Sequence, residues 1–440
     1  MRTQTMISIV LLVLLAVSPV MARTWIVSPD GSGDAPTIQA AIDSVSNGDI
    51  IGLLDGTYTG DGNRGLEIGT NSFTIRSQSG DPSACIIDVE GPGTAYCLGF
   101  WLFSPLDGPI VNIFIRGLTI TRSWGVFGGG IGVEGNVRLT VTNCVFLNNA
   151  ALIRGGGMWI GTTRPVTVAD CTFIGNSAAN GGAIMALEAL FELTGCTFMG
   201  NSADSGGALL LWYMITCTVS NCTFSRNTAP EGAAVTFWEP WQVPALTNSV
   251  IAFNLQGAGV YWDGVETVSL SQNDIFGNEG GDWVGNIAPF LGTGNNFELD
   301  PLFCDLDGQD VSLNGDSPCL AENSPGGELV GAWGWGCPGI SATPEELPAG
   351  VHAVSCQPNP FNPQTSVTFS LAHDEWAEAG VFDLTGRRVE VLVAGTLPRG
   401  QHTVVWDGRD AAGRDMPSGS YIVRLETAGH VSTSKISLIR

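Results

Sequence analysis

Short runs of alternating β-forming residues, broken by Gly and Asn, fill the middle of the chain. Val166-Thr167-Val168, followed by Phe173, is a typical run. This period of two predicts β-strands, and the units lack a helical pattern of about ten residues, which excludes helical solenoids and leucine-rich horseshoes. The units recur every 24 to 27 residues, and each ends on an Asn: Asn149, Asn176, Asn201, Asn227, Asn254 and Asn278.

A repeat of this length indicates stacked turns that bury their hydrophobic faces only against one another. We therefore expect a right-handed parallel β-helix over residues 49–335, with roughly eleven turns about 4.8 Å apart. Equivalent residues would stack in columns. The Asn column would form a ladder of side-chain amides at a tight corner, which is a structural role. An aromatic column inside the coil would contain Phe146, Phe173, Phe198 and Phe224.

A Gly pair follows most of the Asn residues, as in Gly181-Gly182-Ala183-Ile184 and Gly206-Gly207-Ala208-Leu209. Together with Phe173–Asn176 and Phe198–Asn201, these motifs resemble the repeats of the polymorphic outer-membrane proteins, a family of bacterial surface proteins and adhesins. The resemblance covers about residues 117–280 and implies a β-helical coil.

Both ends of the coil have sequences that suit a cap, so we expect the β-helix domain to span residues 23–337. Residues 35–45 predict a short amphipathic helix, which would cover an open sheet edge that invites aggregation. The apolar face of this helix would consist of Ile38, Ala41, Ile42 and Val45. The following Gly48-Asp49 and Gly56-Thr57-Tyr58 resemble the opening of pectate-lyase-like and pectinesterase-like β-helices. Residues 300–337 resemble the closing segment of secreted β-helices.

A Pro-rich stretch at residues 338–357 predicts a linker to a second domain at residues 358–440. Alternating runs separated by Gly turns predict a small Ig-like β-sandwich there. The runs are Val367 to Leu371, Val381 to Leu384, Val389 to Leu392, His402 to Trp406, Tyr421 to Leu425 and Ile436 to Ile439.

Four motifs of this domain resemble C-terminal type 9 secretion sorting domains and the related Ig-like domain of flagellar hook-capping proteins. They are Pro358 to Thr365, Asp383 to Arg387, Trp406-Asp407-Gly408 and Ser418 to Tyr421. The resemblance implies that the outer-membrane secretion machinery is a partner of this domain and that the protein is secreted or displayed at the cell surface. A stabilising terminal sandwich without a role in export is the alternative.

Residues 1–22 predict a signal peptide, with Arg2, an apolar stretch from Met6 to Val17 and the small-residue site Val20-Met21-Ala22. The mature chain would therefore be exported. The net charge is −24, from 42 acidic and 18 basic residues, and Lys435 is the single Lys. Such a chain repels phosphate backbones, so nucleic-acid binding is disfavoured.

The chain has eleven Cys residues, an odd number. Four of them occupy equivalent positions in the repeat, where alternation turns them inward as small buried hydrophobes, and we expect free thiols there. This column is Cys144, Cys171, Cys196 and Cys222. Disulfide bonds are predicted instead for Cys85 with Cys97, and among Cys304, Cys319 and Cys337.

Aromatic residues follow the Gly pairs of three successive repeats at similar distances: Trp212, Trp238 and Trp262. The next position holds Tyr213, Glu239 or Asp263, and Glu188 in the repeat before. Stacked turns would place an aromatic strip beside an acidic one. Indole faces suit sugar rings and carboxylates accept hydroxyl hydrogen bonds, so these residues are candidates for glycan binding. The alternative is that these Trp residues cover the outside of a sheet or fill a corner.

The coil lacks Lys and His, which leaves carboxylates as possible general bases. Glu239 and Asp263 are the candidates, at about the separation that a retaining glycosidase uses. Residues 305–310 predict a plain turn. A Ca²⁺ site formed by Asp305, Asp307 and Asp310 is the alternative, although the spacing departs from the EF-hand pattern. No other cofactor is expected.

Taken together, the sequence predicts a secreted, surface-displayed, non-catalytic β-helix protein for adhesion or glycan binding, with extracellular glycans or neighbouring surfaces as partners. A polysaccharide lyase or glycoside hydrolase is the alternative from another class. A structural spacer is the third.

Overall fold

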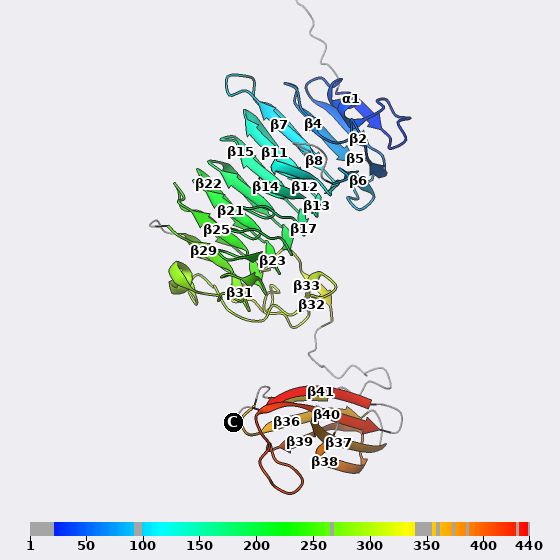
Figure 1. Cartoon of the computed structure of the whole chain (residues 1–440), viewed down its shortest axis with the longest axis vertical. Coiled ribbons are helices and arrows are strands. Elements are labelled where there is room, and N and C mark those ends of the chain that lie inside the picture. Colours follow the sequence, from blue (N-terminus) through cyan, green and yellow to red (C-terminus); the bar gives the residue numbers. More distant parts are fainter. Residues whose placement is uncertain are drawn as a thin grey trace, which may run out of the picture. The chain divides into compact units, whose positions relative to one another are not determined.

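The computed structural model describes residues 22–91, 99–264, 268–338, 354–357, 361–371, 375–383, 387–427 and 431–438. The predicted signal peptide therefore lies outside the described residues, except for Ala22. The chain divides into two compact units, one ending at Ser341 and one beginning at Ala342. The first is a right-handed parallel β-helix and the second is an Ig-like β-sandwich, so the predicted fold class is confirmed (Figure 1).

Three long parallel sheets run along the coil. Sheet A contains β1 (Thr24–Val27), β2 (Asp49–Leu53), β5 (Phe73–Ser77), β8 (Val111–Arg116), β12 (Val137–Thr142), β16 (Pro165–Ala169), β19 (Leu190–Thr194), β22 (Thr216–Ser220), β26 (Ala245–Thr247) and β30 (Ser269–Ser271). Sheet B contains β3 (Gly56–Tyr58), β6 (Cys85–Asp88), β9 (Thr119–Thr121), β13 (Val145–Leu147), β17 (Thr172–Ile174), β20 (Thr197–Met199), β23 (Thr223–Ser225), β27 (Val250–Ala252) and β31 (Asp274–Phe276).

Sheet C contains β4 (Leu66–Glu67), β7 (Phe100–Ser104), β11 (Ile131–Gly135), β15 (Met158–Gly161), β18 (Ile184–Leu187), β21 (Leu209–Trp212), β25 (Val235–Trp238) and β29 (Val260–Trp262). Two short pairs lie between the sheets: β10 (Trp124–Phe127) with β14 (Ala150–Arg154), and β24 (Thr228–Ala229) with β28 (Leu255–Gln256).

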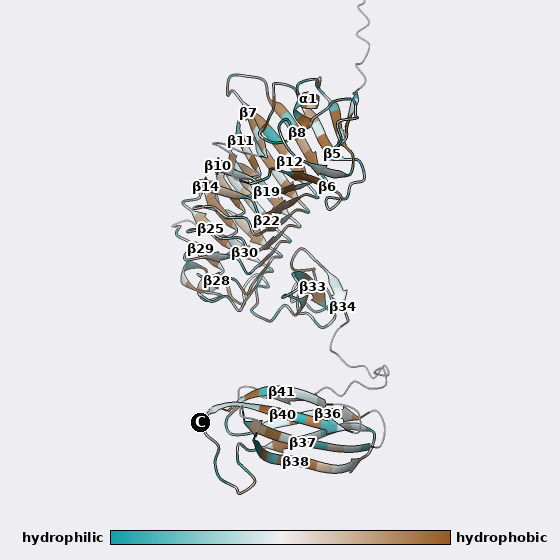
Figure 2. Ribbon diagram, turned by 45° about the vertical axis from the view of Figure 1, so that its right-hand side comes forward, coloured by the Kyte–Doolittle hydropathy of each residue, from teal (hydrophilic) through white to brown (hydrophobic). Residues whose placement is uncertain are grey.

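The core of the coil is a set of side-chain columns, because neighbouring turns pair in register. Phe173 pairs with Phe146 on one side and with Phe198 on the other. Along the column that ends at Phe224, successive ring centroids lie 4.6, 4.9 and 4.7 Å apart and the rings are nearly parallel. All four rings are fully buried, as the repeat predicted. Strands along the coil carry hydrophobic residues (Figure 2).

The predicted Asn ladder is also confirmed. The Oδ1 atom of Asn201 accepts hydrogen bonds from the backbone N–H and the Nδ2 of Asn176, at 2.9 and 3.0 Å. The same pattern repeats along the column to Asn278, whose backbone N–H donates to the carboxylate of Asp282 at 2.8 Å. Each amide therefore satisfies the buried backbone of the preceding turn, and Asp282 ends the ladder.

The four Cys residues of the repeat are buried free thiols, as expected. The backbone N–H groups of Cys144 and Cys171 each donate to the Sγ of the next Cys in the column at 3.4 Å. Burial raises the pKa of the Cys144 and Cys196 thiols well above their usual range. All four side chains are buried in the coil, so the column contributes to packing as small hydrophobic groups.

Two short helices close the ends of the coil. The α-helix α1 (Ile38–Ile42) is shorter than the predicted residues 35–45, although the predicted apolar face is buried. Thr37 caps its N-terminus, accepting a hydrogen bond from the N–H of Ala40. At the other end, the 3₁₀-helix η1 (Gly285–Phe290) places Ile287, together with nearby Trp283, against the last turn.

Residues 300–337, which we call the closing segment, fold back over the outer face of sheet B. Their strands β32 (Phe303–Asp305), β33 (Asp310–Asn314) and β34 (Trp335–Cys337) form a small sheet with β33 in the centre. A disulfide bond joins Cys304 to Cys337. Of the predicted disulfide set, Cys319 stays a buried thiol. Cys85 is likewise a buried free thiol, and Cys97, its predicted partner, lies outside the described residues.

The second unit pairs a three-stranded with a four-stranded antiparallel sheet. The first contains β35 (Val354–Gln357), β36 (Thr365–Leu371) and β39 (Gly400–Trp406), and the second contains β37 (Glu375–Asp383), β38 (Arg388–Leu397), β40 (Gly419–Thr427) and β41 (Val431–Leu438). Its core includes Phe361, Trp406 and Tyr421. The prediction of a linker up to residue 357 was wrong at its end, because β35 pairs with β36.

Among the described residues of both units, the helices are too short and too polar to cross a membrane.

Candidate functional site

The outer face of sheet C carries two of the predicted Trp residues side by side. Trp212, the last residue of β21, pairs in register with Trp238, the last residue of β25. The residues before them, Leu211 and Phe237, are fully buried, so the alternation of the strands turns both Trp rings outward. Both rings are half-buried, with centroids 5.6 Å apart in an edge-to-face arrangement that favours aromatic pairs.

The corner after each strand places the second predicted column beside these rings. Glu188, Tyr213 and Glu239 have left-handed backbones, with φ of 50°, 50° and 44°. The N–H groups of Glu188 and Tyr213 donate at 3.1 Å to the carbonyl oxygens of Trp212 and Trp238, one turn further along. The same tight turn is therefore repeated on three successive strands, and it holds these side chains next to the Trp pair.

Tyr213 connects the aromatic and acidic residues of the site. Its ring stacks between Trp212 and Trp241, with centroid distances of 5.3 and 5.6 Å. A side-chain hydrogen bond to Glu239 raises the pKa of the Tyr213 hydroxyl, which therefore stays protonated and donates to the carboxylate. Trp241 is 54% exposed and was missed from the sequence, because it lies in the loop after β25, outside the repeat.

The prediction that Trp262 continues the Trp column was wrong. Trp262 pairs with the inward-facing Phe237 and not with Trp238. The reason lies in the spacing: Trp238 follows Gly232 by six residues, but Trp262 follows Gly257 by five. Because side chains alternate along a strand, this deletion turns Trp262 toward the core of the last turn, against which it packs. Its Nε1 is buried without a hydrogen-bond partner among the described residues.

The two candidate catalytic residues, Glu239 and Asp263, are connected by a hydrogen bond to the backbone. The Oδ1 atom of Asp263 accepts a hydrogen bond of 3.0 Å from the N–H of Glu239. At the equivalent corners of Glu188 and Tyr213, a main-chain carbonyl oxygen does the same. Asp263 thus completes the last corner of this series, while the Glu239 carboxylate holds Tyr213. Through these contacts, both carboxylates help to fix the positions of the backbone and of Tyr213 beside the Trp pair.

The strip extends further along sheet C than the sequence predicted. Trp159, Met185 and Leu210 form a small buried cluster on the outer face, and half-buried aromatic residues at either end pack against it. These half-buried residues are Trp101, Phe127, Trp212 and Trp238. The Nε1 of Trp159 donates to Glu134 at 2.8 Å. We call the half-buried aromatic residues around this cluster, together with Tyr213 and Trp241, the aromatic face of sheet C.

The three Asp residues of the alternative Ca²⁺ site lie in and beside the turn between β32 and β33, where the sequence predicted a plain turn. The Oδ1 atom of Asp305 accepts from the N–H of Gly308 at 2.9 Å, Asp307 pairs with Arg226, and Asp310 accepts from the N–H of Ser312 at 2.9 Å. Within the described parts of the chain, groups of three or more His, Cys, Asp or Glu that could hold a metal ion are absent.

Family models match two parts of the chain. Residues 99–224 match the model of a right-handed beta helix region, and residues 358–430 match that of the FlgD Ig-like domain. Both agree with the two units described above. A search of curated proteins found no match.

Several solved structures are similar to parts of the chain. Pectin methylesterase PemA from Erwinia chrysanthemi is 11% identical, with a TM-score of 0.36 over 62% of this chain and 92% of that protein. Pectin methylesterase from carrot is 13% identical, with a TM-score of 0.26 over 63% and 88%. PorZ, a surface component of the type-IX secretion system of Porphyromonas gingivalis, is 25% identical, with a TM-score of 0.16 over 20% of this chain and 11% of PorZ. This chain thus spans about a tenth of PorZ.

Proposed function

We propose that this protein is secreted, is displayed at the cell surface and binds glycans there through the aromatic face of sheet C. The observation that carries the proposal is the group formed by Trp212, Tyr213, Trp238 and Trp241. The centroids of neighbouring rings in this group lie 5.3 to 5.6 Å apart, and the rings are partly exposed. Stacked turns of the coil hold Trp212, Tyr213 and Trp238, so little freedom of these three side chains remains to be lost on binding.

The charges around this group favour neutral glycans. Glu188, Glu239 and Asp263 are exposed at the same corner, and the coil contains no Lys. Carboxylates accept hydrogen bonds from sugar hydroxyls but repel uronates. The C–H face of a neutral ring would lie on an indole, with its hydroxyls directed toward Glu239. Both candidate catalytic carboxylates have structural contacts at this corner, Asp263 with the N–H of Glu239 and Glu239 with the hydroxyl of Tyr213, which supports a binding protein over a hydrolase.

Binding can be tested with a glycan array and the mature full-length chain. Trp238→Ala should weaken a bound glycan by up to about tenfold, because aromatic packing contributes about 0.5–1.5 kcal/mol beyond area burial. Trp376→Ala is the matched control, since Trp376 is 47% exposed but belongs to the second unit. Unchanged affinity in a Trp212→Ala/Trp238→Ala double variant would contradict the proposal.

The same glycans should be assayed for release of reducing sugars and unsaturated uronates. If turnover is detected and Glu239→Gln abolishes it while binding is retained, the protein is an enzyme and the non-catalytic proposal fails. If no glycan on the panel binds, the coil is better regarded as a spacer.

We propose further that the second unit directs export through the outer membrane. The match of residues 358–430 to the FlgD Ig-like domain and the resemblance of its motifs to sorting domains support this role. Deleting residues 342–440 should leave the coil folded, because its core is formed within the first unit, but should keep the protein in the periplasm. Protease accessibility on intact cells measures this, and normal surface levels of the truncated protein would disprove the sorting role.

A further inference from the structure

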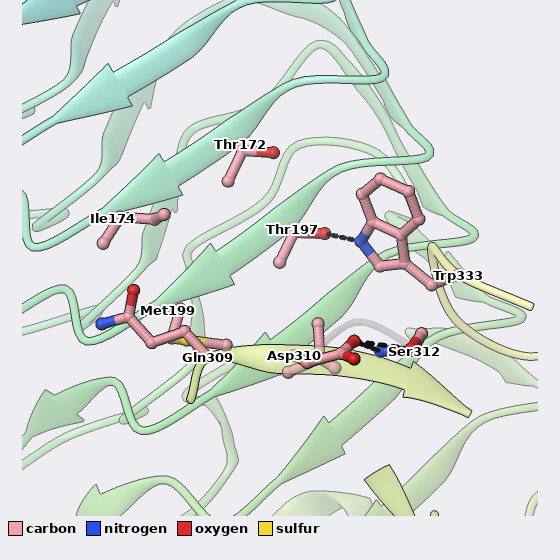
Figure 3. A pocket seen from close by; sticks show the side chains of 9 residues that line it. Thr172, Ile174, Thr197, Met199, Gln309, Asp310, Ser312 and Trp333 are labelled. Atoms are coloured by element: carbon pink, nitrogen blue, oxygen red, sulfur yellow. Dashed lines mark hydrogen bonds between the residues drawn. The ribbon is translucent and has the colours of Figure 1, made fainter. Parts of the chain in front are cut away.

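A cleft lies on a different face of the coil, between the outer surface of sheet B and the closing segment. Its floor is formed by residues of two successive turns, Thr172 and Ile174 on β17 and Thr197 and Met199 on β20 (Figure 3). The opposite wall consists of Gln309, Asp310, Val311, Ser312 and Trp333. The volume is about 360 Å³, within the range of about 300–1,000 Å³ that small-molecule sites occupy.

The wall of the cleft is held firmly against the coil. Three hydrogen bonds join the closing segment to three successive turns: Gly331 N–H to the carbonyl of Asn248 at 2.7 Å, Ala332 N–H to Thr223 Oγ1 at 2.9 Å, and Trp333 Nε1 to Thr197 Oγ1 at 2.7 Å. The Cys304–Cys337 disulfide bond ties the segment to itself. The indole ring of Trp333 is therefore held in one position, although the side chain is 51% exposed.

Polar groups with unused hydrogen-bonding capacity also line the cleft. Thr223 and Thr197 accept hydrogen bonds from the closing segment, but the hydroxyl of Thr172, the next residue of that column, has no partner among the described residues. The Gln309 amide and the Oδ2 atom of Asp310 also lack partners there, since the Oδ1 atom of Asp310 receives both bonds from Ser312. A ligand in the cleft would thus meet donors and acceptors on two sides.

We propose that this cleft is a second glycan-binding site, which accepts one neutral sugar ring. The apolar floor and the indole of Trp333 suit the C–H face of the ring, while Thr172, Gln309 and Asp310 suit its hydroxyls. Anionic ligands are disfavoured, because the single charged residue that lines the cleft is the acidic Asp310. Strand addition by a peptide is excluded as well, because β33 already pairs on both sides. The proposal does not depend on the aromatic face of sheet C.

The indole N–H of Trp333 offers a direct readout, because it lies in the wall of the cleft. The full chain, labelled with ¹⁵N-tryptophan, is titrated with glucose, galactose, mannose, N-acetylglucosamine and their methyl glycosides, and with galacturonate as the anionic comparison. Trp333→Phe assigns the resonance. At least one neutral sugar should shift the Trp333 resonance, and the shift should saturate below about 50 mM, because a single ring is expected to bind with a dissociation constant of a few millimolar. Galacturonate should not shift the resonance.

Variants separate this site from the surrounding surface. Trp333→Ala should weaken the responsive sugar about two- to tenfold, as measured by ligand-observed NMR. Gln309→Gly removes the amide at a position whose φ of 67° glycine accepts readily, and it should weaken the sugar about threefold. Trp335→Ala is the matched control, because Trp335 is 66% exposed, lies two residues away and does not line the cleft.

The proposal is overturned if no sugar shifts the Trp333 resonance, if galacturonate shifts it as strongly as the neutral sugars, or if Trp335→Ala weakens binding as much as Trp333→Ala. Trp238→Ala keeps the two sites apart. It should leave the Trp333 response unchanged, so that failure at one site does not count against the other.

Discussion

Replacing Asn201 with Ala should destabilise the coil by about 3–7 kcal/mol. The side chain of Asn201 is fully buried and makes four hydrogen bonds. Its Oδ1 accepts from the N–H and the Nδ2 of Asn176, and its Nδ2 donates to the carbonyl of Phe173 and to the Oδ1 of Asn227, both at 2.9 Å.

The magnitude follows from what the variant would leave behind. The backbone N–H of Asn176 would lose its acceptor inside the coil, and a buried unsatisfied donor costs about 1–3 kcal/mol. The other three hydrogen bonds contribute about 0.5–1.5 kcal/mol each, and their remaining partners keep at least one other contact. The loss is therefore larger than that of a typical point mutation, which is near 1 kcal/mol.

Urea unfolding followed by far-UV circular dichroism measures the free energy of unfolding of the coil. Asn148→Gly is the matched control. Asn148 is exposed, its φ is 54°, and the equivalent corners of the next two turns already carry Gly175 and Gly200 with φ of 64° and 63°. This control should change stability by less than about 0.5 kcal/mol. If Asn201→Ala costs no more than Asn148→Gly, the ladder does not stabilise the coil and our reasoning is refuted.

Three further predictions concern other parts of the first unit. Asp274 is buried beneath the closing segment, and burial raises its pKa to about 7. Because this exceeds the pKa of about 3.9 in an unfolded chain, the group favours folding below pH 4, and this contribution is lost as the pH rises toward 7. Asp274→Asn keeps an oxygen that can accept the hydrogen bond from the N–H of Leu299. The variant should remove the pH-dependent loss of stability, which is on the order of 3–4 kcal/mol. Equal pH profiles of urea stability for variant and parent would contradict this. Reducing the Cys304–Cys337 bond, which closes a 33-residue loop, should loosen the closing segment by up to about 4 kcal/mol. Hydrogen exchange at residues 331–333 measures this, and protection unaffected by reductant would disprove it. Phe198→Ala should cost about 3–5 kcal/mol by leaving a gap in the aromatic column, as calorimetry would report, and a loss below 1 kcal/mol would mean that the column collapses onto the gap.

Much of the coil could be predicted because the repeat places chemically identical residues at identical positions. Phe173 and Asn176 recur one turn later as Phe198 and Asn201, and parallel pairing in register stacks them. The candidate site could be predicted only where that spacing holds. It holds for Trp212 and Trp238 and fails for Trp262, since a turn shortened by one residue reverses the side to which a side chain points.

The sequence by itself determined the repeat, the inward columns, the corner ladder and the strands of the second unit, because these depend on local periodicity and on contacts between equivalent residues. Only the tertiary structure decided which surfaces meet. Trp241 joins Tyr213 from a loop outside the repeat, and Trp333 reaches Thr197 across 136 positions of the chain. Such contacts depend on how the closing segment and the loops fold back over the coil, and periodicity carries no information about that path.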